Sequence, residues 1–135
     1  MPLPLISALT AGVLIIMQMA LLYAVVRARR SNRQSLGDGG KGELLLAIRR
    51  HGNFAENAAI FIAGFALLEL LGTGQIEVAV LCGVFVAARV AHIVGLSMAR
   101  NTVNPLRIGG TAVTVFVGVT LGIRLIVAAV RILTM

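Results

Sequence analysis

Four long apolar stretches dominate the chain, and short polar segments separate them. Their pattern predicts helices over residues 3–27, 43–71, 76–98 and 106–133, with polar residues crowding only the first half of the second helix. Each stretch meets the roughly 20 residues that a helix needs to cross the hydrocarbon core of a bilayer. The alternation typical of membrane β-barrel strands is absent from them. We therefore expect an all-α membrane protein in which residues 1–135 form a single domain, a four-transmembrane-helix bundle.

Composition agrees with a bilayer environment. Hydrophobic residues make up 59% of the 135 residues, charged residues only 13%, and the mean hydropathy is +0.98. A soluble domain of this length has a more even balance. The net charge is +7, but most basic residues flank the apolar stretches, which indicates contact with anionic lipid headgroups rather than with nucleic acid. The single Cys82 excludes an internal disulfide, and its apolar surroundings predict a packing role.

The polar connections predict the orientation of the bundle. The first connection, residues 27–41, and the third, residues 99–105, contain basic residues, whereas the short connection after Leu71 has no lysine or arginine. By the positive-inside rule, the two basic connections face the cytoplasm and both termini lie on the opposite side. No basic segment precedes the first stretch, and its length exceeds the apolar core of a signal peptide. We therefore expect it to be retained as a helix.

A stripe of polar residues crosses the second helix. Arg49, Asn53 and Glu56 are spaced so that they lie within an arc of roughly 60° on one helix face. Glu56 lies about 10 Å beyond Arg49 along the helix axis. A carboxylate at that depth costs roughly 2.5 kcal/mol or more unless it finds a partner. His51 and Asn57 flank the stripe, and we expect them to make local or interfacial contacts.

The third and fourth helices bring further polar groups to the same level. Arg89 and His92 lie one turn apart on the third helix, and Arg107 opens the fourth helix on the face that carries Thr111 and Thr114. One interpretation is that these residues only hold the helices together, with Arg89 paired to the carboxylate of the second helix. The excess of arginine over carboxylate favours the other interpretation, a binding site for an anionic ligand.

Two charges lie apart from this cluster. Glu69 on the second helix and Arg124 on the fourth both lie near the far membrane surface, and we expect them to pair with each other. The motifs of hydrolases and phosphate-binding loops are missing from the sequence. Two histidines on different helices, with one acid near them, do not make a set of metal ligands, so we expect no metal.

The polar motifs carry a resemblance to a known family. The stretch Ala47–Asn57 resembles the hallmark motif of the MAPEG family, the membrane-associated proteins in eicosanoid and glutathione metabolism. Arg89–His92 and Pro105–Arg107 fall where that family has its next two motifs. The resemblance covers nearly the whole chain, and Gly37–Gly40 is similar to the corresponding segment of small bacterial members.

The resemblance implies a homotrimer in the bacterial inner membrane, with glutathione as co-substrate bound between neighbouring subunits and open to the cytoplasm. Arg107 would lie near the thiol, and Arg27 would reach the site from the adjacent subunit, so these two are the expected catalytic residues. The full set of expected glutathione-binding residues is Arg49, Asn53, Glu56, His92, Arg107, Arg27 and Thr111. Arginines suit the two carboxylates of glutathione, and Glu56 suits its ammonium group.

The expected function is a glutathione transferase, a lipid hydroperoxide reductase, or both, acting on lipophilic substrates. Leu96 and Thr111 replace tyrosines of well-known eukaryotic members, and Ile108 replaces a serine found in some of them. A member that binds glutathione or scaffolds a membrane complex without catalysis is therefore the alternative. A small multidrug exporter is a third hypothesis, but such transporters need an acidic residue in the first helix, and residues 3–27 contain none.

Overall fold

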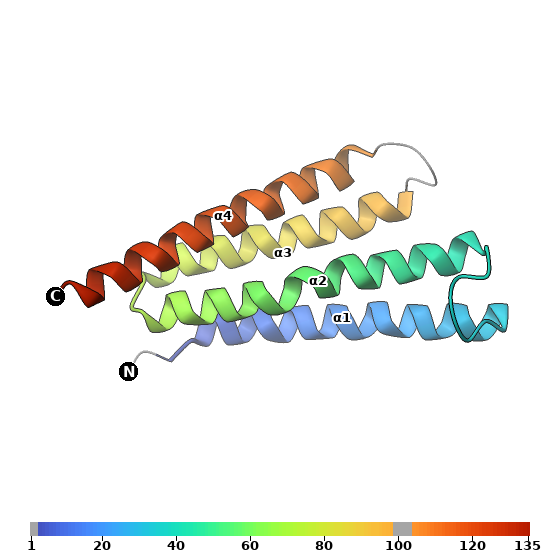
Figure 1. The fold of residues 1–135 in the computed structure, drawn as a ribbon, viewed down its shortest axis with the longest axis horizontal. Coiled ribbons are helices and arrows are strands. Elements are labelled where there is room, and N and C mark those ends of the chain that lie inside the picture. Colours follow the sequence, from blue (N-terminus) through green and yellow to red (C-terminus); the bar gives the residue numbers. More distant parts are fainter. Residues whose placement is uncertain (1–2, 99–103) are drawn as a thin grey trace.

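The protein is an antiparallel bundle of long helices. The computed structural model describes residues 3–98 and 104–135, and within them the chain forms α1 (Leu5–Asn32), α2 (Gly42–Leu70), α3 (Gln75–Met98) and α4 (Pro105–Leu133) (Figure 1). All four are long and apolar enough to cross a membrane. The expected all-α class with four spanning helices is confirmed, and both described chain ends lie at one end of the bundle. Most of the basic segment expected between α3 and α4, with Arg100, falls outside the described residues.

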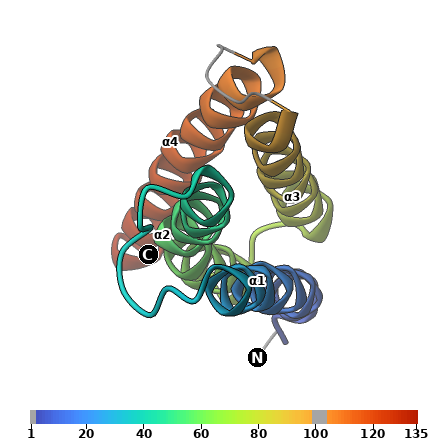
Figure 2. The same cartoon turned by 90° about the vertical axis from the view of Figure 1, so that its right-hand side faces the viewer.

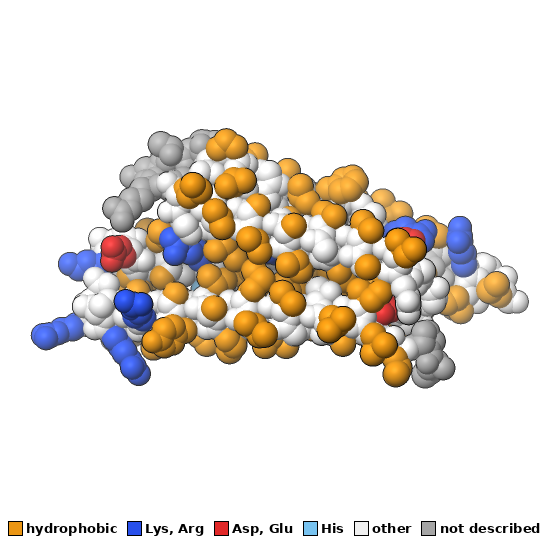
Figure 3. Space-filling model, turned by 180° about the vertical axis from the view of Figure 1, so that it is seen from behind, with side chains coloured by type: hydrophobic (Ala, Val, Ile, Leu, Met, Phe, Trp, Pro, Cys, Tyr) orange, Lys and Arg blue, Asp and Glu red, His pale blue; other side chains and the backbone are white. Residues whose placement is uncertain are grey.

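The helices pack as two pairs, α1 with α2 and α3 with α4 (Figure 2). The two pairs are close at the end that carries the α2–α3 turn, and they diverge towards the end that carries the α1–α2 connection (Figures 1 and 2). On the outer surface shown in Figure 3, apolar side chains cover the middle of the molecule, and basic side chains gather towards its two ends. This distribution matches a hydrocarbon layer between two headgroup layers.

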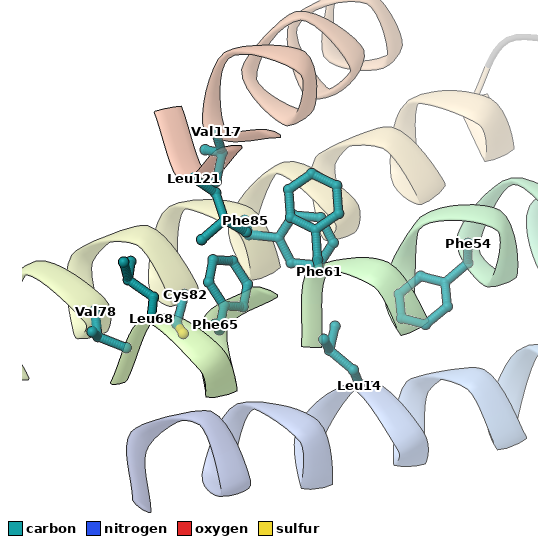
Figure 4. Packing of buried hydrophobic residues seen from close by; sticks show 10 residues of the cluster. All are labelled: Leu14, Phe54, Phe61, Phe65, Leu68, Val78, Cys82, Phe85, Val117 and Leu121. Atoms are coloured by element: carbon teal, nitrogen blue, oxygen red, sulfur yellow. The ribbon is translucent and has the colours of Figure 1, made fainter. Parts of the chain in front are cut away.

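The core lies where all four helices meet. Phe61, Phe65 and Phe85 form an aromatic cluster, with the rings of Phe61 and Phe85 stacked at a centroid distance of 4.1 Å (Figure 4). Leu14 of α1 and Cys82 of α3 pack against this cluster. Because the thiol is buried among apolar side chains, the packing role expected for it is confirmed.

Two glycines let α3 and α4 approach each other until their backbones touch. A Cβ on Gly110 would lie 2.6 Å from the carbonyl oxygen of Ala88 and 2.8 Å from the backbone nitrogen of His92. A Cβ on Gly95 would overlap the backbone nitrogen of Arg107. Small residues at such crossings are what permits close packing of helices in membranes. This contact fixes the height of the first turns of α4 against α3.

The first helix is longer than its apolar stretch. We expected it to end at about residue 27, but α1 continues to Asn32 and ends with Arg33 in the left-handed region at φ 51°. The extra turn is basic, with Arg29 and Arg30 at the negative end of the helix dipole, where cations are stabilised. The Arg29 guanidinium also donates to the carbonyl oxygens of Ser35 and Gly37, at 3.1 and 3.0 Å, and so orders the loop.

The pairing expected between Glu69 and Arg124 is wrong. Arg124 forms a two-pronged ion pair with Glu77 in the first turn of α3. Glu69 is 3% exposed and instead accepts hydrogen bonds from the backbone nitrogens of Ile6 and Ser7, at 3.1 and 2.9 Å, and from the Ser7 hydroxyl at 2.6 Å. No side chain of α1 itself caps this helix start. The carboxylate of α2 therefore caps the N-terminus of α1.

Candidate functional site

The polar stripe of α2 lies on its outer surface beside α4. Gly64 marks the direction of α4, because a Cβ there would lie 2.8 Å from the Leu121 side chain. Around the helix axis, Asn53, Arg49 and Glu56 lie roughly 20°, 60° and 80° from that direction. Arg49 and Glu56 are exposed, and Asn53 is partly buried. The stripe therefore lies on the side of α2 turned towards α4, at the end where the two helices diverge (Figure 2).

Arg107 and Thr111 stand on the matching face of α4. The side chain of Asn104 accepts a hydrogen bond from the backbone nitrogen of Leu106 at 2.9 Å, and Pro105 occupies the first turn, so α4 begins firmly just before Arg107. Arg107 and Thr111 are exposed and lie within roughly 80° of the direction of Leu121, which contacts α2. The positive end of the α4 dipole adds to the charge of the guanidinium here.

His92 is held between α3 and α4. Its ring is 7% exposed, and its Nδ1 lies 3.0 Å from the Thr111 hydroxyl oxygen. That hydroxyl also lies 3.0 Å from the backbone carbonyl of Arg107, and while it donates there it accepts a hydrogen from Nδ1 of the matching His92 tautomer. The structure thus joins His92, Thr111 and Arg107 in one chain of contacts. Thr114, expected on the same face, points inward and is buried.

Arg89 is buried without a carboxylate partner among the described residues. It is 3% exposed, and it donates to the carbonyl oxygen of Asn53 at 2.8 Å and to the Thr114 hydroxyl at 3.4 Å. The expected ion pair with Glu56 is wrong, because that carboxylate lies on the exposed face of α2. Glu56 acts on Arg89 only as a more distant charge, so the buried guanidinium is incompletely neutralised, which is costly. An anion bound nearby would therefore be stabilised.

Arg27 points away from its own bundle. It lies roughly 140° around α1 from the direction of the buried Leu14, and its side chain is exposed. Within this chain it therefore lies away from the stripe on α2. The structure therefore groups the other expected site residues on or between α2, α3 and α4 and leaves this one on the outside.

One polar contact between α1 and α2 was not predicted from the sequence. Gln18 of α1 and His51 of α2 lie 2.7 Å apart, between Nε2 atoms. Gln18 lies four residues after Leu14 and seven before Val25, both buried, and this helical spacing is the signal that places it on the inner face. The local contact expected for Asn57 is confirmed, because its amide donates to the Asn53 carbonyl at 3.1 Å.

Comparison with known proteins gives consistent matches. The sequence model of the MAPEG family matches residues 7–127. The inner membrane protein YecN of Escherichia coli strain K12 is 38% identical over 91 residues, which are 67% of this chain and 69% of that protein. The inner membrane protein YecN of Escherichia coli O6:H1 strain CFT073 matches with the same identity and coverage. Together with the four apolar helices, these matches support a multi-pass protein of the bacterial inner membrane.

Proposed function

Because this chain belongs to the MAPEG family, we propose that it binds glutathione beside α2 and α4, and that it transfers the glutathione thiolate to lipophilic electrophiles, reduces lipid hydroperoxides with it, or does both. The observation that carries the proposal is the stripe of Arg49, Asn53 and Glu56 on the side of α2 turned towards α4, at the end of the bundle where Arg107 stands in the first turn of α4. Three of these four side chains are charged and exposed on a protein surface that is otherwise apolar at membrane depth. Such residues indicate a binding site.

The charges of the stripe complement glutathione, which has two carboxylates and one ammonium group. The Arg49 guanidinium can bind a carboxylate through two parallel charge-assisted hydrogen bonds. Glu56, two turns along the same face, can accept from the ammonium group. The buried charge of Arg89 stabilises an anion on the near side of α2, where its guanidinium contacts the Asn53 backbone. The positive surface also draws the net-anionic tripeptide from solution.

Arg107 is the residue that activates the thiol in this proposal. A guanidinium beside a thiol lowers the pKa of the thiol, and the first turn of α4 supplies further positive potential. The thiolate then attacks an electrophilic carbon and displaces its leaving group. With a hydroperoxide it attacks the outer oxygen, and a second glutathione completes a reduction that yields an alcohol, water and glutathione disulfide. Thr111, held by His92, offers a hydroxyl next to this position.

A second subunit completes the proposed site. Arg27 faces away from its own bundle, so it is available to a neighbour's stripe in a homotrimer. The basic connection between α1 and α2 lies at the same end as the stripe, and by the positive-inside rule this supports a site on the cytoplasmic side, with the termini on the other. A lipophilic acceptor would enter from the bilayer through the apolar surface around it.

The second candidate function is glutathione binding without turnover. Leu96, one of the positions where eukaryotic relatives have tyrosine, is 7% exposed and offers no hydroxyl. Thr111 has a hydroxyl, but it already donates to a backbone carbonyl. Activation of the thiol then rests on Arg107, and turnover by the wild-type protein decides between the two functions.

The deciding experiment compares turnover by the wild-type protein, Arg107→Ala and Arg30→Gln in detergent, with a generic aromatic electrophile and a lipid hydroperoxide. We expect Arg107→Ala to lower turnover roughly 10- to 100-fold while glutathione still binds, because the thiolate loses its stabilising charge. Arg30→Gln removes an exposed arginine at the same end of the bundle and should leave turnover unchanged. Glutathione binding without turnover by the wild type would favour the second function.

A further inference from the structure

A cavity lies at the opposite end of the bundle from the proposed glutathione site. Its volume is about 260 Å³, and it lies between the α2–α3 turn, residues 71–74, and the last turns of α4. Figure 1 shows that α4 runs past this turn, so its final residues extend over it. The polar Gly72-Thr73-Gly74 sequence interrupts two apolar helices here, which puts the cavity at the level of a membrane surface.

Basic side chains line this cavity. Arg124 and Arg131 project from one face of α4, roughly 20° apart around the axis and about 10 Å apart along it. The described part of the chain contributes no acidic residue to the cavity lining itself. Two nitrogens of the Arg124 guanidinium donate to the Glu77 carboxylate, which lies outside the cavity lining and neutralises the charge of Arg124. Arg131 is exposed and makes no ion pair with any described residue.

The remaining walls are of two kinds. The turn contributes residues 71–74, of which Thr73 is the one with a polar side chain, whereas α4 contributes the apolar residues Val127, Ala128 and Ile132. The arginines would bind an anionic group, and the apolar residues of α4 would contact an acyl chain. An anionic lipid at a bilayer surface has both of these parts. Gly74 directly precedes α3, and the positive end of that helix dipole adds to the attraction.

We propose that this cavity binds a phosphate group, held mainly by Arg131 with Arg124 fixed beside it by Glu77. The headgroup of an anionic phospholipid and a soluble phosphate share this chemistry, and the apolar wall favours the lipid. Arg131 in the last turn of α4 also stabilises the helix dipole, but that role needs neither a cavity nor a second arginine. The ligand would anchor the overhanging end of α4 to the membrane surface.

The test uses the full chain in detergent and counts bound lipids by native mass spectrometry, with phosphatidylglycerol and phosphatidylcholine in separate titrations. Three variants are compared: Arg131→Gln, Ala128→Phe, which fills the cavity, and Arg30→Gln, which makes the same charge change at the other end of the bundle. We expect the wild type and Arg30→Gln to prefer phosphatidylglycerol, and Arg131→Gln and Ala128→Phe to lose at least about tenfold in affinity for it. Because Arg131 is exposed, its variant should fold normally.

Titration with inorganic phosphate, followed by thermal unfolding, separates the two sources. One outcome is that phosphate raises the unfolding temperature of the wild type but not of Arg131→Gln, while neither lipid is preferred. That result would assign the cavity to a soluble phosphate, and the proposed phosphate site would stand. Equal binding of both lipids with no effect of phosphate would overturn the proposal. So would equal losses in Arg131→Gln and Arg30→Gln, because attraction would then be general rather than local to the cavity.

Discussion

Gly110→Ala is expected to destabilise the bundle by about 3 kcal/mol, the upper end of the usual range for overpacking. The added methyl would lie 2.6 Å from the Ala88 carbonyl oxygen and 2.8 Å from the His92 backbone nitrogen. Both are backbone atoms of α3, so no side chain can rotate away, and α4 must move. The movement would also separate His92 from Thr111 and carry Arg107 out of position.

The neighbouring glycine provides a matched control. Gly109 is exposed, and a Cβ there meets nothing within 4 Å, so Gly109→Ala should be neutral or stabilise the helix by up to about 1 kcal/mol. Both variants would be unfolded in mixed micelles with increasing dodecyl sulfate and followed by circular dichroism. The two substitutions should shift stability in opposite directions. Equal shifts would show that α3 and α4 are not packed backbone to backbone at this point.

Glu69→Gln is expected to cost about 3 kcal/mol of stability, because hydrogen bonds to a charged group are worth about 1.5–3 kcal/mol each. The carboxylate accepts three hydrogen bonds from Ile6 and Ser7 at the start of α1. An amide has only one oxygen, so its NH₂ group would face a donor of Ile6 or Ser7. That donor would be left buried and unpaired.

Unfolding of Glu69→Gln in the same micelles would be compared with Glu43→Gln, an exposed change in the first turn of α2 that should cost less than about 1 kcal/mol. A double-mutant cycle with Ser7→Ala adds a direct test. Loss of the Ser7 hydroxyl should cost less once Glu69 is gone. If the effects of Glu69→Gln and Ser7→Ala on stability were additive, Glu69 would not cap α1. The same would follow if Glu69→Gln and Glu43→Gln lowered stability equally.

Hydropathy located the helices but not all of their ends. The starts of α2, α3 and α4 fall within one residue of the sequence prediction, because apolar stretches begin there and Pro105 favours a first turn. The end of α1 was placed five residues too early. Arginine is a good helix former, so the helix continued through Arg27–Arg30 after the membrane-facing stretch had ended. An apolar pattern marks where the hydrocarbon layer ends, and a helix can continue beyond that point.

Helical spacing predicted which polar residues share a face, and it failed to predict their partners. The stripe Arg49, Asn53 and Glu56 does lie on one side of α2. Residue counting put Glu69 at the level of Arg124, but Glu77 at the start of α3 lies at that level too and faces the arginine. Depth along a helix is set by the sequence, whereas the neighbour a side chain faces depends on how the helices pack.

Binding of glutathione at the stripe on α2 is tested most directly by equilibrium binding of radiolabelled glutathione to the purified protein. Wild type and Arg30→Gln are predicted to bind one glutathione per site saturably, and Arg49→Gln and Glu56→Gln to bind it roughly 10- to 100-fold more weakly, as loss of one charge-assisted contact requires. Absence of saturable binding to the wild type, or equal binding by Arg49→Gln and Arg30→Gln, would contradict the account.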